Sequence, residues 1–280
     1  MTKWIVTDRE VYNRTDPSKG RAAGYRVKEI RSGGRLELEI YPYWDARPKS
    51  GVKSHKLKES RIAQKNQNEK DSRKRFIRLL CVNFTRKDLH VTLTYETFDG
   101  QRLPTLEEVL RDIRNYLSRI NRRRKKAGLE SAKYMYVIEG AKEEGEKRTR
   151  IHAHLILEDG LSRDEIESLW PFGYANADRL QPNDFGLEGL GRYLMKDPNG
   201  RRRWCSSKNL KQPEVRIYDH KISRRTIAEI EINKDSAKEM VNKLYPDYWL
   251  HDPERDVQIR TNTFVSGAYV AIMLTARNRS

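Results

Sequence analysis

Residues 150–157 read Arg-Ile-His-Ala-His-Leu-Ile-Leu, and they carry the most informative pattern in this chain of 280 residues. Isoleucine and leucine in so short a run favour a β-strand. Side chains alternate between the faces of a strand, so His152 and His154 share one face while Ala153 and Leu155 share the other. Two imidazoles on one strand face can chelate a divalent metal ion. Ordinary solvated strands also carry such pairs, so the neighbouring segments must decide between the two interpretations.

A second strand is predicted just before the histidines, at Lys133–Glu139. The charged segment Gly140–Arg150 follows as a turn, so the two strands are expected to pair as a hairpin. Glu139 then ends a strand beside His152 and His154 and is the best third metal ligand. The alternative is a carboxylate that faces water at the end of a strand. Three glutamates in the turn are weaker ligand candidates: Glu143, Glu144 and Glu146.

A strand and a long helix are predicted upstream of this hairpin. The strand is Leu89–Tyr95, with Thr92 and Thr94 on one face and three apolar residues on the other. The helix opens with a capping box formed by Thr105 and Glu108. It presents one apolar stripe and ends in five basic residues, 122–126. Such cations suit the helix dipole and could also contact a phosphate backbone.

Two shorter helices are predicted downstream. Ser162 and Glu165 form a second capping box. Asp184 is expected to cap the next helix, whose buried stripe is Leu187, Leu190 and Leu194. Tyr193 lies at the flank of that stripe, and Lys196 lies almost one turn further along. A tyrosine in this position is either a packing residue with a hydrated hydroxyl or, beside a lysine and a metal-chelating strand, a nucleophile.

Composition indicates a polyanionic partner. The formal net charge is +17, with 57 Lys and Arg against 40 Asp and Glu, and nucleic acid is the simplest partner for such an excess. Two cysteines provide no disulfide framework. The amino-terminal residues lack a signal-peptide apolar run, and the longest apolar stretch, Phe264–Leu274, is too short to span a bilayer. The sequence therefore predicts a soluble, cytoplasmic protein.

Three motifs, taken in order, resemble those of the HUH endonucleases. They are Val91-Thr92-Leu93-Thr94-Tyr95, His152-Ala153-His154 and Tyr193-Leu194-Met195-Lys196-Asp197. Within that superfamily the chain looks like the rolling-circle replication initiator (Rep) proteins of phages, plasmids and small DNA viruses. Asn209–Pro213 is a looser match to a phage-type Rep segment. Relatives with two tyrosines place the second where this chain has Asp197, so the resemblance implies a single catalytic tyrosine.

The predicted fold class is α+β, with a central antiparallel sheet covered by helices. The expected strands of this sheet are 90–95, 134–139, 151–157 and about 213–232. We expect an endonuclease core at residues 76–232 and a basic amino-terminal extension at 1–75. That extension holds a β-hairpin within 24–40, whose second strand should end at Pro42, and a helix. Residues 233–280 form the carboxy-terminal extension, with a helix at 235–244 and an unplaced apolar tail.

The resemblance implies site-specific nicking and rejoining of single-stranded DNA at an origin, through a 5′-phosphotyrosine link. Tyr193 would be the nucleophile, and Lys196 would neutralise developing negative charge. His152, His154 and Glu139 would hold a divalent metal, with Mg or Mn suiting phosphoryl chemistry and Zn suiting the histidines. DNA contacts are assigned to a further set of residues: Thr92, Thr94, Arg150 and Arg192. The partners would be single-stranded or hairpin origin DNA and the replication machinery, with a separate helicase because the chain has no P-loop pattern.

Three other functions stay open. A relaxase or transposase of the same superfamily would share the chemistry. A two-histidine RNA phosphoesterase would use His90-Val91-Thr92-Leu93 as one His-x-Thr-x half, although its second half needs Ser or Thr where His154 stands. A non-catalytic basic nucleic-acid-binding protein would account for the charge but not for the three ordered motifs.

Overall fold

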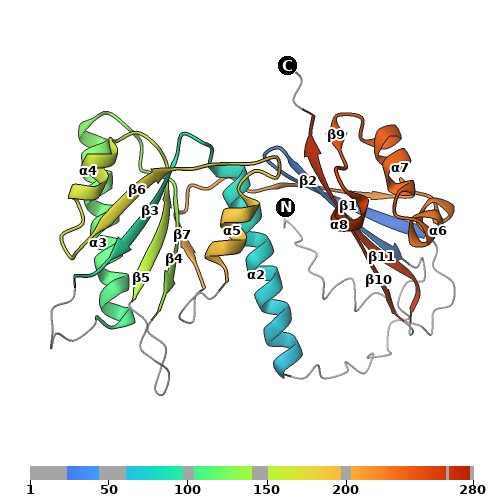
Figure 1. Ribbon diagram of the computed structural model, residues 1–280, viewed down its shortest axis with the longest axis horizontal. Coiled ribbons are helices and arrows are strands. Elements are labelled where there is room, and N and C mark those ends of the chain that lie inside the picture. The colour runs from blue at the N-terminus through green and yellow to red at the C-terminus, as the bar shows by residue number, and fades with distance from the viewer. Residues whose placement is uncertain are drawn as a thin grey trace, which may run out of the picture. The chain divides into compact units, whose positions relative to one another are not determined.

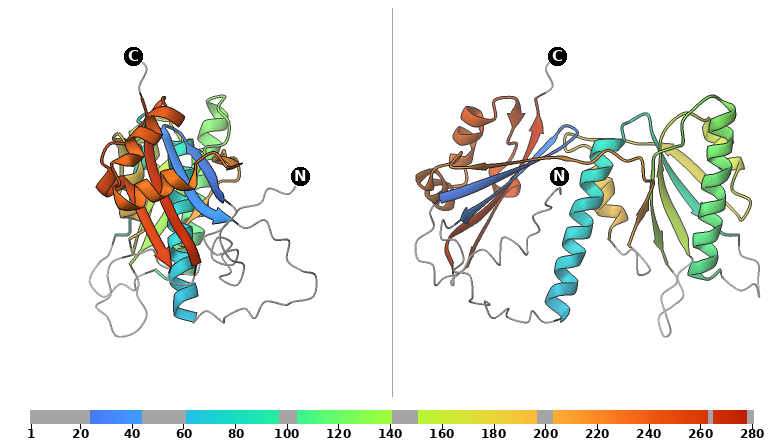
Figure 2. Two further views of the ribbon diagram at one scale, coloured as in Figure 1. Left: turned by 90° about the vertical axis from the view of Figure 1, so that its right-hand side faces the viewer. Right: turned by 180° about the vertical axis from the view of Figure 1, so that it is seen from behind.

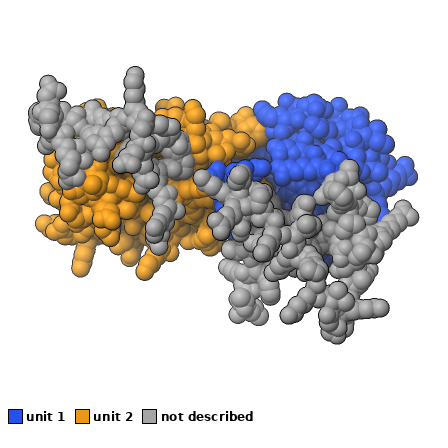
Figure 3. Space-filling model, turned by 90° about the horizontal axis from the view of Figure 1, so that it is seen from below, with its two compact units in different colours: residues 1–71, 213–280 blue, residues 72–212 orange. Residues whose placement is uncertain are grey.

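The computed structural model describes residues 24–43, 61–96, 104–140, 151–196, 203–262 and 265–277. Arg150, Asp197 and the glutamates of the turn after Glu139 lie outside these ranges. The chain divides into two compact units, residues 1–71 with 213–280 and residues 72–212. Figure 3 colours them separately. These divisions fall at 71/72 and 212/213, whereas the sequence suggested 75/76 and 232/233.

The second unit, residues 72–212, is built on a five-stranded sheet in the order β6-β3-β5-β4-β7 (Figure 1). Every neighbouring pair in it is antiparallel. The predicted hairpin of Lys133–Glu139 and the histidine strand is present as β4 and β5. The strands are β3 (Leu89–Thr94), β4 (Tyr134–Glu139), β5 (His152–Leu157), β6 (Ala175–Arg179) and β7 (Cys205–Ser206).

Helices cover both faces of this sheet, so the fold class is α+β as predicted. On one face lie α3 (Leu106–Lys126) and α4 (Arg163–Ser168), and Figure 2 shows α3 running alongside the strands. Both predicted capping boxes form, at Thr105 with Glu108 and at Ser162 with Glu165. The apolar stripe of α3 packs on the alternate strand residues that point to this face. Buried in this core are, among others, Val91, Leu93, Ile113, Ile120, Ala153 and Leu155.

The opposite face carries the histidines and is covered by α2 (Arg61–Asn83) and α5 (Glu188–Leu194). Phe76 and Leu80 of α2 are fully buried against Ile156 and against Val137. Leu187 and Leu194 complete this core, as the predicted stripe required.

The start of α5 differs from the prediction. Asp184 does not cap it: the N-cap residue is Leu187, which makes no side-chain capping bond. Asn183 and Gly186 exchange two backbone hydrogen bonds, of 3.0 and 2.8 Å, and close a tight turn there. This turn uses the residues that would have formed the first helical turn, so α5 begins only after Leu187. It also ends at Leu194, which leaves Lys196 beyond the helix.

The first unit is built on a second antiparallel sheet, in the order β10-β11-β2-β1-β8, with β9 also paired to β11. Its strands are β1 (Gly24–Ser32), β2 (Arg35–Tyr43), β8 (Glu214–Asp219), β9 (Tyr248–Trp249), β10 (Val257–Asn262) and β11 (Val265–Ala276). One face packs on helices α6 and α7. The helices of this unit beyond α2 are α6 (Arg224–Ile232), α7 (Ser236–Leu244) and α8 (Pro253–Asp256).

Several expectations about this unit change. The hairpin β1–β2 and helix α7 are present as predicted, but β2 continues through Pro42, which pairs with Tyr25 of β1. The pairing of β11 with β2 stops at Ile40, so Pro42 lies where the strand has only one partner. The predicted strand at 213–232 is wrong as a member of the histidine sheet. Only 214–219 is a strand, it pairs with β1, and residues 224–232 form α6 with Ser223 as N-cap.

Candidate metal and nucleophile site

Strand register brings the predicted metal ligands together. Glu139 of β4 lies opposite His152 of β5, which in turn lies opposite Thr94 of β3. One row along, His154 lies between Val137 and Thr92. Because alternate residues share a face, both histidines, Glu139 and both threonines project from the face that α2 and α5 cover.

Glu139, His152 and His154 form a cluster that fits a divalent cation. One ligand atom from each residue lies within 4.8 Å of the others. The His152 Nε2 atom is 3.4 Å from the Glu139 carboxylate, and the two imidazole rings stand edge to face, with centroids 5.0 Å apart. Two nitrogens and a carboxylate oxygen are a donor set that Zn, Mn or Mg can accept.

His154 has the properties of a metal ligand rather than those of a charged surface group. It is 5% exposed, and its Nε2 atom is buried without a hydrogen-bond partner among the described residues. Burial, with the neighbouring His90 and His152, lowers the pKa of His154 to about 4. The ring is therefore neutral at pH 7, as a metal-binding imidazole must be.

Helix α5 places Tyr193 over this cluster. The Tyr193 ring contacts the His154 ring, with centroids 6.0 Å apart and planes at 69°. Its side chain is 57% exposed, so a strand of DNA can reach it. Lys196 follows the helix and is exposed; its backbone N–H donates to the Tyr193 carbonyl. Among the described residues, the Lys196 ammonium forms no hydrogen bond or ion pair.

The residues assigned to DNA contact have different surroundings. Thr92 Oγ1 lies 3.4 Å from His154 Nδ1, beside the candidate metal ligands. Thr94 Oγ1 donates to the Tyr174 carbonyl at 3.1 Å. Arg192 is exposed but already forms an ion pair with Glu188 at 2.5 Å. Arg150 lies outside the described residues.

Sequence reasoning missed two residues at this site. His90 was considered only for the RNA phosphoesterase alternative, yet its Nε2 atom lies 3.1 Å from His154 Nδ1. Its place on the same strand face as Thr92 was the available signal. Tyr174, which is 68% exposed, follows Gly173, and the Thr94 N–H donates to its carbonyl. Gly173 adopts φ +153°, and a Cβ there would lie 2.3 Å from the Glu96 amide nitrogen, so only glycine allows this close pairing.

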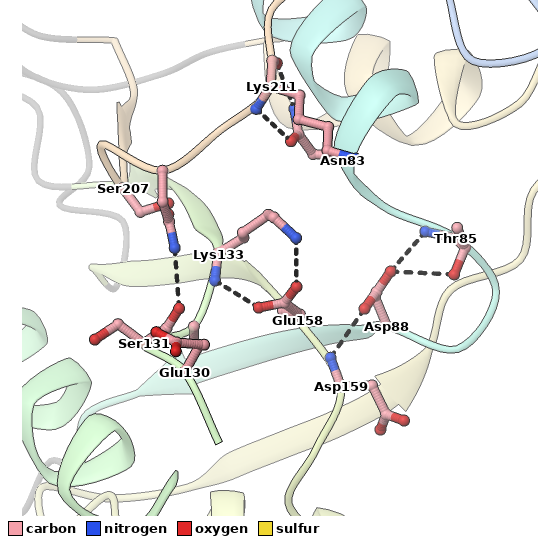
Figure 4. A network of polar contacts seen from close by, with 12 residues as sticks. Asn83, Thr85, Asp88, Glu130, Ser131, Lys133, Glu158, Asp159, Ser207 and Lys211 are labelled. Atoms are coloured by element: carbon pink, nitrogen blue, oxygen red, sulfur yellow. Dashed lines mark hydrogen bonds and ion pairs between the residues drawn. The ribbon is translucent and has the colours of Figure 1, made fainter. Parts of the chain in front are cut away.

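A polar network holds the ends of β3, β4 and β5 that lie away from the histidines (Figure 4). Glu158 accepts from the Lys133 ammonium at 2.5 Å and from the Lys133 amide at 3.1 Å. Asp88 accepts from the amides of Thr85 and Asp159.

Asn83 and Lys211 exchange two hydrogen bonds of 2.8 and 2.9 Å in the same region (Figure 4). The segment Asn209–Pro213 therefore has a structural contact with the end of α2.

A basic groove lies on the α3 side of the sheet, away from the histidines. Its volume is about 740 Å³, and it lies between the second half of α3 and the segment 128–134. Arg114, Arg122 and Lys125 line it and form no ion pair with a described carboxylate, and Tyr134 contributes an aromatic ring. Unpaired cations beside an aromatic ring are suited to a phosphate backbone.

Comparison with known proteins gives one family. Residues 88–198 match the model of a family of replication-associated proteins, described as the ORF2 type. That range runs from just before β3 to just after α5 and contains the whole site described above. No curated protein and no solved structure shows significant similarity to the chain. Within the part of the chain that the structure describes, no helix is both long and apolar enough to cross a membrane.

Proposed function

We propose that this chain, whose residues 88–198 are similar to replication-associated proteins, is a rolling-circle replication initiator. It would nick and rejoin single-stranded DNA at an origin through a covalent link to Tyr193. The observation that carries the proposal is the contact of an exposed tyrosine with His154, a member of a cluster that can bind a metal. Similarity to a replication-associated family agrees with this assignment.

Glu139, His152 and His154 would hold the metal ion. When bound, a divalent cation at these residues would supply Lewis-acid polarisation of the scissile phosphate. Mg or Mn is the metal we expect for phosphoryl transfer, while the two imidazoles also suit Zn. The neutral state of His154 at pH 7 leaves a lone pair available on Nε2.

Tyr193 would carry the covalent step. Its phenolic oxygen attacks phosphorus in line, the bond from phosphorus to the 3′ oxygen breaks, and the phenolic proton passes through solvent to the departing 3′ oxygen. The products are a 5′-phosphotyrosine and a free 3′-OH. Because the number of phosphoester bonds is unchanged, the reverse attack by a 3′-OH can rejoin strands. The exposed ammonium of Lys196 would offset negative charge at the phosphate or the phenolate.

DNA affinity would come from the positive charge of the chain. The net charge of +17 and the basic groove beside α3 both favour a phosphate backbone. Thr92, Thr94 and Arg192 would position the substrate strand near the site, together with Arg150. A separate helicase would expose the single strand, and other replication proteins would extend the free 3′-OH.

A relaxase or transposase acting on mobile-element DNA is the second candidate, because it uses the same arrangement of histidines and tyrosine. Cleavage of an oligonucleotide from a replication origin beside the gene would favour the initiator. Cleavage only of transfer or transposition ends would favour the second candidate.

The test is covalent trapping. The protein is incubated with end-labelled single-stranded DNA and Mn²⁺ and is then run on a denaturing gel. Wild-type protein should give a band of protein joined to DNA, whereas the double variant His152→Ala/His154→Ala should give none and should still bind DNA in a filter assay. A wild-type protein that binds DNA but never forms the band would instead be a non-catalytic binding protein. Full activity of the double variant would overturn the metal assignment.

A further inference from the structure

We propose that His90 is a positioning residue, which accepts a hydrogen bond from the Nδ1–H group of His154 and so holds the His154 Nε2 lone pair toward the metal site. The proposal deepens the proposed function, because it concerns the same ligand cluster. The bond itself, however, belongs to the metal-free protein and can be measured there.

Strand register explains why the two rings meet. His90 and Thr92 lie on the same face of β3, and Thr92 is directly opposite His154 on β5. His90 is therefore the diagonal neighbour of His154, which is within reach of two aromatic rings. The His90 Nε2 atom lies 3.1 Å from His154 Nδ1, and the ring centroids are 5.1 Å apart.

A hydrogen bond between two neutral imidazoles needs one donor and one acceptor. If His154 donates from Nδ1, its Nε2 atom carries a lone pair and can bind a metal. If His90 donates instead, Nδ1 of His154 becomes the acceptor and Nε2 carries the proton. The direction of this one bond therefore decides whether His154 can be a ligand through Nε2.

Burial favours the first direction. The Nε2 atom of His154 is buried and has no partner among the described residues. An N–H group at this position would be a buried donor without an acceptor, which carries a substantial desolvation cost. A lone pair there faces the site formed with Glu139 and His152 and is satisfied when a cation binds.

The surroundings of His90 agree with its role as acceptor. When Nε2 of His90 accepts, its Nδ1 atom carries the proton. Asp178 lies directly opposite His90 on β6 and so shares its sheet face. The Asp178 carboxylate accepts from Arg163 at 3.1 Å and from Asn176 at 2.7 Å, which hold it in place. A fixed negative charge beside the ring favours a donor on His90. Such partners behind a histidine ligand commonly change metal affinity by about 10- to 100-fold.

The first experiment is ¹⁵N NMR of the histidine rings in metal-free wild-type protein at neutral pH. The nitrogen shifts and the two-bond couplings identify which nitrogen is protonated. We expect His154 to be protonated at Nδ1. Protonation at Nε2 would overturn the proposal, and this result does not depend on any variant folding or on any nicking activity.

The second experiment is titration calorimetry of Mn²⁺ with variants of His90. His90→Phe keeps a ring of similar shape but removes the acceptor, so Mn²⁺ affinity should fall by about 10-fold or more. His90→Gln keeps an acceptor on a side chain of similar reach, so its affinity should stay within about threefold of wild type. His251→Gln, in the other unit, is the control for loss of a histidine and should bind as wild type does.

Two results would contradict the role of His90. One is wild-type Mn²⁺ affinity in folded His90→Phe, and the other is an equal loss in the Phe and Gln variants, which would indicate a role of ring shape alone. Failure of the proposed function gives a different pattern. In that case wild-type protein binds no Mn²⁺ or forms no adduct, while the NMR result still decides the direction of the bond between His90 and His154.

Discussion

His154 and Tyr193 divide the work of the site by their exposure. His154 is 5% exposed, which keeps its ring neutral and fixed, whereas Tyr193 is 57% exposed and accessible to a DNA strand. Other tyrosines of this unit are packing residues: burial raises the pKa of Tyr95, of Tyr116 and of Tyr136 well above the ordinary value. A phenol whose ionised form is so disfavoured is a poor nucleophile.

Tyr193→Phe should therefore leave a folded protein that forms no covalent adduct. The change removes only a hydroxyl from an exposed ring, so the free energy of unfolding should change by less than about 0.5 kcal/mol. Tryptic mass spectrometry of the wild-type adduct should place the oligonucleotide on Tyr193. Tyr174→Phe is the matched control, because Tyr174 is also exposed and lies near the site, and it should form the adduct. An oligonucleotide attached to Tyr174 or to any other tyrosine would refute the assignment.

At the scale of elements, a glycine sets the position of α5 and hence of Tyr193. Gly191 is buried against α2, and a Cβ atom there would lie 2.7 Å from Ile77 Cγ1. Gly189, two residues earlier in the same helix, has open space around it. The helix can therefore approach α2 only along the Gly191 side.

Gly191→Ala should push α5 away from α2 and move Tyr193 relative to His154. We expect a destabilisation of about 1–3 kcal/mol and a rate of adduct formation lower by about tenfold or more, because small displacements of a nucleophile are costly. Gly189→Ala should instead stabilise by about 0.5–1 kcal/mol, as alanine does in a helix interior. Denaturant unfolding and single-turnover trapping measure the two effects. Equal behaviour of the two variants would show that Gly191 does not set this packing.

The network at the far end of the sheet makes stability depend on acid. Burial alone would raise the pKa of Glu158, but the hydrogen bonds from Lys133, together with the charges of Lys133 and Arg124, hold it below its ordinary value. The unfolded chain therefore binds this proton more readily than the folded one. The stabilisation is complete above the ordinary carboxyl pKa of about 4.3 and is lost as pH falls through the lower folded value.

Glu158→Gln should remove this part of the pH dependence. The difference in unfolding free energy between wild type and the variant should be largest at pH 6 and should shrink as the pH is lowered to 3. Glu130→Gln is the control, because its side chain forms no ion pair with a described residue. Chemical denaturation at a series of pH values gives the curves, and a constant difference between wild type and Glu158→Gln would contradict the prediction.

At the scale of the whole molecule, excess positive charge should dominate DNA binding. Many of the 57 Lys and Arg residues sit in ion pairs, but those of the basic groove do not pair with a described carboxylate. Cations without a partner release bound counterions from DNA without first breaking an internal contact. The groove should therefore contribute more to the salt dependence than paired cations do.

Replacement of Arg114, Arg122 and Lys125 by Gln should lower the slope of log affinity against log salt by up to about 2 for single-stranded DNA. The control replaces three cations that pair with acids in the first unit: Arg225, Lys234 and Lys238. It changes the net charge equally and should alter the slope less. Fluorescence anisotropy between 50 and 200 mM salt measures both. A wild-type slope in the groove variant would exclude the groove from the DNA contact.

The sequence alone determined the local elements of the site. Period-two alternation gave β3, β4 and β5 and the shared face of His152 with His154, and capping boxes gave the starts of α3 and α4. Glu139 was placed correctly because a hairpin brings residues close in sequence together. These features depend on interactions within a few residues or across one turn, which a pattern of residue types records.

Only the tertiary structure decided which distant segments meet. β8 pairs with β1 rather than with the histidine sheet, and the unplaced tail after residue 256 became two strands of the first unit. The contact of His90 with His154 joins residues 64 positions apart, and that of Tyr193 with His154 depends on how closely α5 approaches α2. Strand pairing uses backbone groups that every residue except proline carries in full, and helix packing depends on the combined shape of two surfaces. Neither leaves a periodic signal in one segment of the chain, so the final geometry of the site is settled by the packed fold.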